Sequence, residues 1–405
     1  MPTAIRVPQL RTVLIASGVI LTLAMGVRHG FGFWLQPISQ ANGWTRETYS
    51  LALALQNLMW GVFGPVAGMA ADRFGTARVV IAGAFLYAAG LLWMAMVDQA
   101  TLFVVGSGLL IGAALACTAF GAISGIIGRI APEAKRSWAL GLSSAAGSFG
   151  QFLMMPVEQQ LISSLGWNNA FHVLGIMIVV LMVPMAYFLR EPVAVKSTAR
   201  EQSIPEAVRE AFAYPAFRLL LAGYFVCGFQ LVFIGVHMPA YLKDRGLSDG
   251  KVAVVALALI GLFNIFGSYY AGKLGGIFPK RYLLASIYIS RVAVIGLFLI
   301  APLTAWSVYV FSAAIGLLWL STVPLTNGVI AGIFGVRYLS MLAGFVFLSH
   351  QVGSFLGVWL GGYLYTRQGS YDTVWMITLV LGVAAALVNL PINEKPILRQ
   401  PLAPA

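Results

Sequence analysis

The sequence predicts an all-α membrane protein with twelve transmembrane helices in two six-helix, pseudo-symmetric bundles, and three observations support this. First, 60% of the 405 residues are hydrophobic and only 9% are charged, whereas soluble domains carry about 25% charged residues. Second, apolar runs of the ~20 residues that cross a bilayer follow one another along the chain. Third, short patterns of the first half recur in the second half, as expected of a duplicated membrane protein.

Twelve apolar runs are long enough to span a membrane. They cover residues 12–36, 49–70, 79–97, 102–129, 138–162, 170–189, 218–241, 251–273, 281–301, 305–333, 338–365 and 372–391. A long polar stretch with charged and Ser residues separates the sixth run from the seventh. The sequence therefore predicts an N-terminal six-helix bundle over 1–190, a cytoplasmic linker over 191–217 and a C-terminal six-helix bundle over 218–405.

The positions of the basic residues account for the formal net charge of +12. If the N-terminus is cytoplasmic, eighteen of the 25 Lys and Arg residues lie on the cytoplasmic side, five lie on the other side, and Arg28 and Arg291 lie inside spans. This asymmetry is the positive-inside rule, so the charge requires no nucleic-acid partner. We expect an inner-membrane protein, embedded in the lipid bilayer, with both termini cytoplasmic.

Two short patterns repeat at nearly equal offsets. A Gly-rich loop with basic residues begins at Gly68, after the second run, and another begins at Gly272, after the eighth, 204 residues later. The Gly-Ser-Phe of the fifth run at Gly147 recurs in the eleventh at Gly353, an offset of 206. The two halves are therefore expected to share one fold.

The first loop resembles the cytoplasmic signature of the major facilitator superfamily, Gly-x-x-x-Asp-Arg-x-Gly-x-Arg, and residues 68–78 match every fixed position. The resemblance implies a transporter that works by alternating access, with a gating group made of Gly68, Asp72, Arg73 and Arg78. Gly68 also permits close helix contact. The second copy departs from the signature, because Gly276 replaces the acidic residue. An alternative is that the loop only fixes topology through its charges.

Several fragments are similar to the monocarboxylate porter family and its oxalate and formate exchanging relatives. They are Gly-Trp-Thr-Arg at 43–46, Lys-Arg at 135–136 and Gly-Ser-Tyr-Asp at 369–372. The resemblance implies a small organic anion, either a mono- or a dicarboxylate, as substrate. One departure bears on the site. The eighth span lacks the arginine that binds the anion in this family and offers Asn264 instead.

Arg28 is the first candidate for substrate binding, because the first span lines the central cavity in the superfamily that the chain resembles. A planar guanidinium suits a carboxylate. His29 follows it and is a candidate for holding the anion or a proton. The alternatives are that Arg28 extends to the outer surface and that His29 is a structural residue, hydrogen bonded within the fold.

Arg291 is a second intramembrane arginine, near the middle of the ninth span. Charged residues at this depth are functional by default, yet the ninth span is peripheral in the superfamily. We therefore weigh substrate binding against an arginine satisfied by backbone carbonyls and polar neighbours. The remaining binding candidates are polar or aromatic residues at depth in other spans: Gln151, Gln230, Trp319 and His350.

The spans contain few acidic residues. No Asp or Glu is expected near the middle of a span, and the nearest, Glu158, is expected towards the outer end of the fifth. An arginine with no fixed anion nearby favours a carboxylate substrate. A coupling proton would then travel on His29, on His350 or on the substrate acid, or anion exchange would replace it. The charge of Arg28 favours the last two, because a second positive charge beside it would be repelled.

The predicted function is secondary active transport of a small organic anion across the inner membrane, as proton symport or anion exchange. The alternative is an efflux pump of the same fold that exports a drug or toxicant, although a cation exporter would be expected to keep an embedded carboxylate. No nucleophile elbow, phosphate loop or metal-ligand spacing is present, so we expect no enzyme, no cofactor and no metal site. We expect the chain to function as a monomer.

Overall fold

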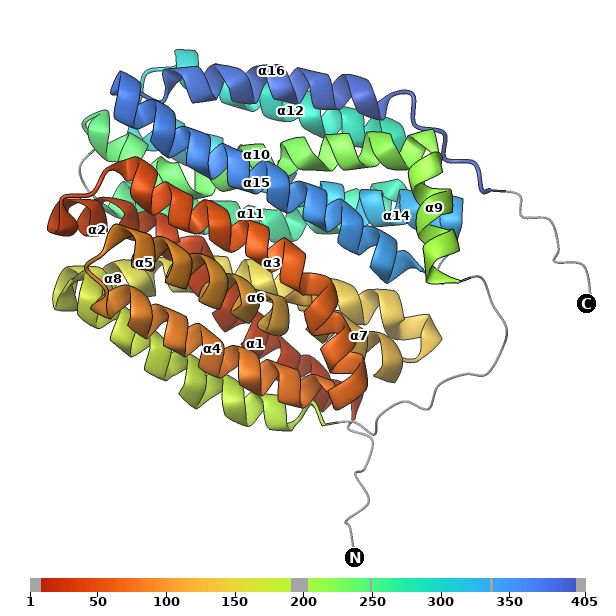
Figure 1. Cartoon of the computed structure of the whole chain (residues 1–405). Helices are drawn as coiled ribbons and strands as arrows, with labels where there is room; N and C mark the ends of the chain where they lie inside the picture. The colour runs from red at the N-terminus through yellow and green to blue at the C-terminus, as the bar shows by residue number, and fades with distance from the viewer. Residues whose placement is uncertain (1–8, 191–202, 248–249, 336–337, 398–405) are drawn as a thin grey trace, which may run out of the picture.

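The computed structural model describes residues 9–190, 203–247, 250–335 and 338–397, and the regular elements in these ranges are all helices. Figure 1 shows them in two bundles that lie side by side, α1 to α8 in one and α10 to α16 in the other. Helices satisfy their own backbone polar groups, which lipid cannot do, and this is why long apolar runs fold in this way.

The first bundle follows the chain to Tyr187. Its elements are α1 (Leu10–Gly30), η1 (Phe31–Trp34), α2 (Leu35–Asn42), α3 (Arg46–Phe74), α4 (Thr76–Met96), α5 (Ala100–Gly106), η2 (Ser107–Ile111), α6 (Gly112–Thr118), α7 (Phe120–Ile130) and α8 (Glu133–Tyr187). The later elements are α9 (Ile204–Ala213), α10 (Pro215–Asp244), α11 (Gly250–Gly275), α12 (Lys280–Ile300), α13 (Ala305–Leu318), α14 (Thr322–Phe334), α15 (Leu339–Gln368) and α16 (Asp372–Asn389).

The number of membrane crossings depends on Gly166. Among the described residues, eleven helical stretches are long and apolar enough to cross a membrane, and one of them, Ala139–Tyr187, has 49 residues. At 1.5 Å per residue that is roughly 70 Å of helix, about twice the thickness of a bilayer. Gly166 interrupts it with φ 80° and ψ 159°, a backbone conformation that glycine adopts without strain. Counting the two sides of Gly166 separately gives the twelve crossings expected from the sequence.

Breaks within the membrane occur in the first, fourth and tenth crossings, and in the fourth the backbone of Ala119 is extended between α6 and α7. In the first, the helix tightens to a 3-10 turn at η1, because Pro37 has no backbone N–H and its ring crowds the carbonyl four residues earlier. The Tyr49 hydroxyl donates a hydrogen bond of 2.6 Å to the Phe31 carbonyl at this break. In the tenth crossing, α13 ends at Leu318 and α14 begins at Thr322. Such breaks expose backbone groups that side chains have to satisfy.

The segment predicted as a polar linker contains a helix. α9 occupies residues 204–213 of the expected 191–217 linker, and residues 191–202 lie outside the described part of the chain. A capping box starts α9, in which Ser203 and Glu206 hydrogen bond to each other's backbone N–H. These bonds hold the pKa of Glu206 below its usual value. The long apolar runs of the sequence did not predict α9, because this helix is amphipathic and too short to span a membrane. It lies outside the bundle that follows it (Figure 1).

The two bundles make closer contact at one end than at the other. We call the end with Leu10, Phe74 and Lys280 the basic end, and the end with Asn42 and Asp244 the opposite end. α3 packs along α15, and towards the opposite end a Cβ on Gly362 would overlap Ser50. Halfway along, a Cβ on Gly61 would come within 2.9 Å of Gln351.

Towards the basic end these contacts stop. Gly64 and Gly68 lie on the same face of α3 as Gly61, one and two turns further on, and a Cβ on either would meet no atom within 4 Å. The pair α8 and α11 shows the same change, from close contact at Gly261 to open space at Gly141. The bundles therefore meet at the opposite end and separate towards the basic end, as Figure 1 shows for α3 and α15.

Candidate functional site

Arg28 lies in the last turn of α1, where the break begins. Its Nη2 donates to Asn57 Oδ1 at 2.5 Å, and its guanidinium lies 5.1 Å from the centre of the Trp60 ring. Asn57 is held by a bond of 2.7 Å from its own Nδ2 to the Leu53 carbonyl. The side chain of Arg28 is half-buried, and its buried Nε has no partner. A positive charge with only neutral partners and an unused donor is suited to an incoming anion.

His29 lies beside Arg28 and is also half-buried. Its Nδ1 is 2.6 Å from the Met25 carbonyl one turn earlier, which fixes Nδ1 as the protonated nitrogen. This bond leaves Nε2 as the polar atom of the ring that can reach a substrate or water.

Two aromatic rings, those of Phe347 and Trp60, lie between His350 and Arg28, the first against His350 and the second against Arg28. Its imidazole stacks on Phe347, with ring centres 5.9 Å apart and planes at 10°. The Phe347 ring meets the Trp60 ring edge to face at 5.0 Å, and Trp60 lies under Arg28. His350 itself is buried, with Nδ1 hydrogen bonded to Gln351 and Ser354. The structure thus connects two predicted binding residues across the junction between the bundles.

Arg291 is fully buried and uses its donors within its own bundle. Nε and Nη2 donate to the Leu318 carbonyl at 3.2 and 2.6 Å, and Nη2 also reaches the Trp319 carbonyl at 2.5 Å. Nη1 contacts Cys227 Sγ at 3.4 Å and Gln230 Oε1 at 3.5 Å. The two carbonyls stand at the break between α13 and α14, so Arg291 satisfies the backbone groups that this break exposes. These contacts correspond to the structural alternative for Arg291.

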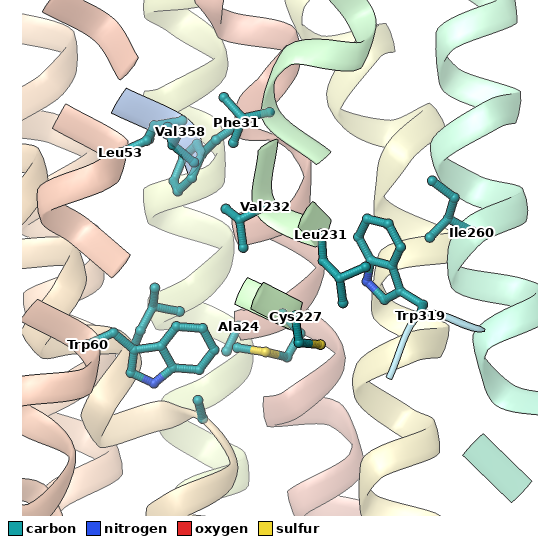
Figure 2. Packing of buried hydrophobic residues seen from close by; sticks show 14 of the residues in the cluster. Ala24, Phe31, Leu53, Trp60, Cys227, Leu231, Val232, Ile260, Trp319 and Val358 are labelled. Atoms are coloured by element: carbon teal, nitrogen blue, oxygen red, sulfur yellow. The ribbon is translucent and has the colours of Figure 1, made fainter. Parts of the chain in front are cut away.

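Gln230 and Trp319 belong to the same cluster. Gln230 is fully buried, accepts from Arg291 and donates from Nε2 to the Thr378 carbonyl at 3.0 Å. The Trp319 ring is almost completely buried, and Figure 2 shows it across a layer of Leu231 and Val232 from Trp60. The structure therefore places these two predicted residues with Arg291 and apart from Arg28.

Gln151 lies at the junction of the bundles. Its Nε2 donates to the Leu257 carbonyl of α11 at 3.3 Å. Nearby, Asn264 Nδ2 donates to Ser148 Oγ at 2.9 Å, and Asn264 Oδ1 accepts from the backbone N–H of Leu320 at 2.9 Å. Asn264, the polar residue that the eighth span offers, thus joins α8, α11 and the α13–α14 break.

A charged clamp joins the bundles at the opposite end. Arg46 forms an ion pair with Asp244 at 2.5 Å, and its Nη1 donates to the Tyr371 hydroxyl at 3.0 Å. Its guanidinium stacks 3.8 Å from the centre of the Tyr365 ring. Behind the clamp, buried His237 hydrogen bonds to the Tyr371 hydroxyl and to the Val358 carbonyl. Arg46 is the last residue of the Gly-Trp-Thr-Arg fragment, but the sequence did not reveal its partners.

The predicted gating residues lie at the basic end. Gly68 faces open space on α3, and the side chains of Arg73 and Arg78 are exposed. Gly75 has φ 89°, which allows α4 to begin directly after α3. The side chain of Asp72 is outside the described part of the structure, so its place in the gating group stays a prediction.

Glu158 lies closer to the candidate site than the sequence indicated. It is 0% exposed, and neither carboxyl oxygen has a hydrogen-bond partner. It packs against Gly30, two residues beyond Arg28, so an acidic residue does lie near the candidate site. The sequence could not show this neighbour, because which residues of α8 face α1 depends on how the two helices pack. The argument against a cation exporter, which depended on a missing embedded carboxylate, therefore no longer applies.

A cavity of about 920 Å³ lies along α1 and α8 towards the basic end. Arg11, Thr22 and Lys135 are among its lining residues, but most of its walls are apolar. None of the predicted binding residues lines it. This cavity therefore does not define the substrate site.

The fold and the sequence together define a class of protein. Residues 15–331 match the Major Facilitator Superfamily, and the chain belongs to this family. It is a membrane transporter and not an enzyme.

Two curated relatives and one solved structure show which proteins of the family the chain is similar to. The chain is 27% identical to monocarboxylate transporter 11 of Homo sapiens, over 84% of this chain and 74% of that protein. It is 23% identical to the oxalate:formate antiporter of Oxalobacter formigenes, over 95% of this chain and 92% of that protein. These matches confirm the resemblance seen in the sequence fragments. A bacterial homolog of the human lysosomal transporter Spinster, in an inward-facing and occupied conformation, has a similar fold, with a TM-score of 0.71, 18% identity and coverage of 93% of this chain and 95% of that one.

Arg291→Ala should destabilise the protein, because it leaves the Leu318 and Trp319 carbonyls without donors in an apolar interior. We expect a loss of roughly 1–3 kcal/mol for each buried group left unsatisfied, measured by thermal unfolding in detergent. Arg218→Ala, which removes an exposed arginine, should have little effect. Equal stability of the two variants would contradict the structural role of Arg291.

Arg46→Gln and Asp244→Asn should weaken the clamp non-additively, since each removes the same ion pair. A double-mutant cycle of unfolding free energies should give a coupling of about 0.5–3 kcal/mol. The pair of Arg245 and Asp372 is a matched control, because its side chains are 50% and 62% exposed. Its coupling should be smaller, about 0.2–1 kcal/mol. Full additivity at Arg46 and Asp244 would show that the clamp contributes nothing.

Proposed function

We propose that this protein transports a small organic anion, a mono- or dicarboxylate, by alternating access, as proton symport or anion exchange. The observation that carries the proposal is Arg28, a half-buried guanidinium whose partners are neutral and whose Nε is unused. In an apolar surrounding such a charge favours an anion that accepts two parallel hydrogen bonds.

The relatives support the same class of substrate. One is called a monocarboxylate transporter and another an oxalate:formate antiporter. A carboxylate at Arg28 would also lie close to His29 and to the Trp60–Phe347 contact. It would thus lie against residues of both bundles. A ligand at a junction of this kind can bias how the two bundles are arranged.

The unequal ends of the molecule support alternating access. The described form is closed at the opposite end by the clamp of Arg46 and Asp244, and its bundles separate towards the basic end. We propose that the other form breaks the clamp and brings α3 towards α15 at Gly64 and Gly68. Gly68, Asp72, Arg73 and Arg78 would then close the basic end as the gating group.

The basic residues also support an orientation. We propose that the basic end faces the cytoplasm and that both termini are cytoplasmic, in a protein of the inner membrane, because Lys and Arg concentrate on that side. The described form is then open to the cytoplasm. The substrate bound at Arg28 would leave or enter from that side.

Arg28→Ala should abolish anion binding, and Arg28→Lys should impair it strongly because it keeps the charge but loses the planar fork. The measurement is the thermal shift of purified protein with formate, oxalate and lactate. At 100 times the Kd a bound anion stabilises the native protein by about 2.7 kcal/mol, and this shift should vanish in Arg28→Ala. Arg218→Ala should keep the wild-type shift. A normal shift in Arg28→Ala would show that the first-span site is wrong.

A reporter fused after Ser203 should report the cytoplasm, and one fused after Gln99, which lies at the opposite end between α4 and α5, should report the other side. Green fluorescent protein and alkaline phosphatase fusions give complementary signals. Phosphatase activity at Ser203 would reverse the proposed orientation.

A further inference from the structure

Glu158 is an unpartnered acid in the interior of the first bundle. It is fully buried on α8, and neither of its carboxyl oxygens has a hydrogen-bond partner. An ionised carboxylate without donors in such a place costs far more free energy than the neutral acid. The packing around Glu158 in the described form therefore holds a protonated carboxyl.

Glycines place this carboxyl directly against α1. A Cβ on Gly30 would overlap a carboxyl oxygen of Glu158, and one on Gly26 would come within 2.8 Å of the Gly150 carbonyl. These contacts lock the middle of α1 onto α8. Gly30 is also the last residue of α1 before the 3-10 turn. The acid therefore touches the chain where the first crossing is broken, beside Arg28 and His29.

The titratable groups around Glu158 do not compensate a negative charge in this form. Arg28 turns to Asn57 and Trp60, and His29 bonds to the Met25 carbonyl. The nearby hydroxyls donate elsewhere. Tyr49 of α3 bonds to the Phe31 carbonyl at 2.6 Å, and Tyr87 of α4 bonds to the Ala24 carbonyl at 3.2 Å.

The other elements packed on α8 carry their charges at the membrane surfaces. Lys251 begins α11 at the opposite end and is exposed, and Arg129 of α7 and Lys273 of α11 are exposed at the basic end. In the second segment of α8, His172 Nδ1 bonds to the Asn168 carbonyl at 3.0 Å. Of the charged residues on these elements, Arg28 is thus the one closest in sequence to Gly30, the residue that Glu158 contacts.

Charge balance then links Glu158 to Arg28. In a medium of low dielectric the positive charge of Arg28 is stabilised by one negative charge within the bundle. Either a bound carboxylate supplies it while Glu158 is protonated, or Glu158 supplies it by losing its proton to water when the site is empty. The two states keep the same net charge.

We propose that Glu158 is a proton-binding site, and that its proton and an organic anion at Arg28 bind and leave together, which makes the transport a proton symport. The proposal rests on the proposed function for its anion and on the described packing for its proton. Loss of the proton leaves a carboxylate beside Gly30 that needs hydrogen-bond donors. The end of α1 must then change its conformation, and the break at η1 is the hinge for this change.

Infrared spectroscopy tests the proton site without any substrate. At neutral pH the wild-type protein should show the carbonyl stretch of a protonated carboxylic acid, and Glu158→Gln should lose it. Asp98→Asn removes an exposed carboxyl from the loop between α4 and α5 and should keep the band. If Glu158→Gln does not elute as a folded species, Glu158→Asp replaces it, and its band should shift in frequency. A band that is unchanged in the variant used would overturn the proposal.

Transport of radiolabelled lactate in liposomes tests the coupling. Glu158→Gln imitates the protonated acid, so it should lose uptake driven by a pH gradient but keep lactate–lactate exchange, whereas Asp98→Asn should keep both. Wild-type uptake driven by pH in Glu158→Gln would overturn the coupling. Failure of the proposed function gives a different result, because wild-type protein would then fail to exchange lactate while its infrared band still depended on Glu158.

Discussion

The cost of leaving a polar group unpaired in an apolar surrounding is the constraint on which this structure depends. Unbroken helices meet it with their own backbone bonds, but broken crossings, among them the first and the tenth, leave backbone groups that need outside partners. Tyr49 supplies one at the Phe31 carbonyl, and Arg291 supplies several at the carbonyls of Leu318 and Trp319. Each of these two breaks therefore fixes a buried polar side chain from a neighbouring helix. These side chains, in turn, determine which residues are left free to bind a solute.

The same constraint bears on where the proposed movement of the two halves would take place. Within the first bundle, glycines bring α1 and α8 into backbone contact at Gly26 and Gly150, where there is no space for a sliding motion. Between the bundles, polar contacts such as Asn264 with Ser148 and Arg46 with Asp244 join the helices, and the close contacts stop towards the basic end. Hydrogen bonds and ion pairs of this kind can be exchanged for water at small net cost. The junction is therefore where the molecule can open.

Hydropathy is a local property, and it was sufficient to predict the number of crossings and the fold. The loop at residues 68–78 and the fragment at 43–46 were sufficient to indicate the family branch, which the relatives confirm. The short amphipathic α9 was not predicted, because it has no long apolar run. Contacts could not be predicted for a different reason: the contact of Glu158 with Gly30 depends on how α8 packs against α1, and the partners of Arg46 lie in the other half of the chain. No pattern along the sequence records such contacts.

The two buried arginines show why intramembrane charge alone does not identify a binding site. Both lie in apolar spans, and sequence reasoning could separate them only by analogy with the superfamily. Arg291 is fully enclosed, and its contacts are directed at fixed carbonyls, so an anion would have to displace the groups that hold the α13–α14 break. Arg28 is half-buried, has an unused Nε and donates a hydrogen bond to the neutral amide of Asn57. Displacing that amide leaves no broken helix unsupported. Spare donors and access, rather than depth, are therefore what distinguish Arg28 as the proposed binding site from Arg291.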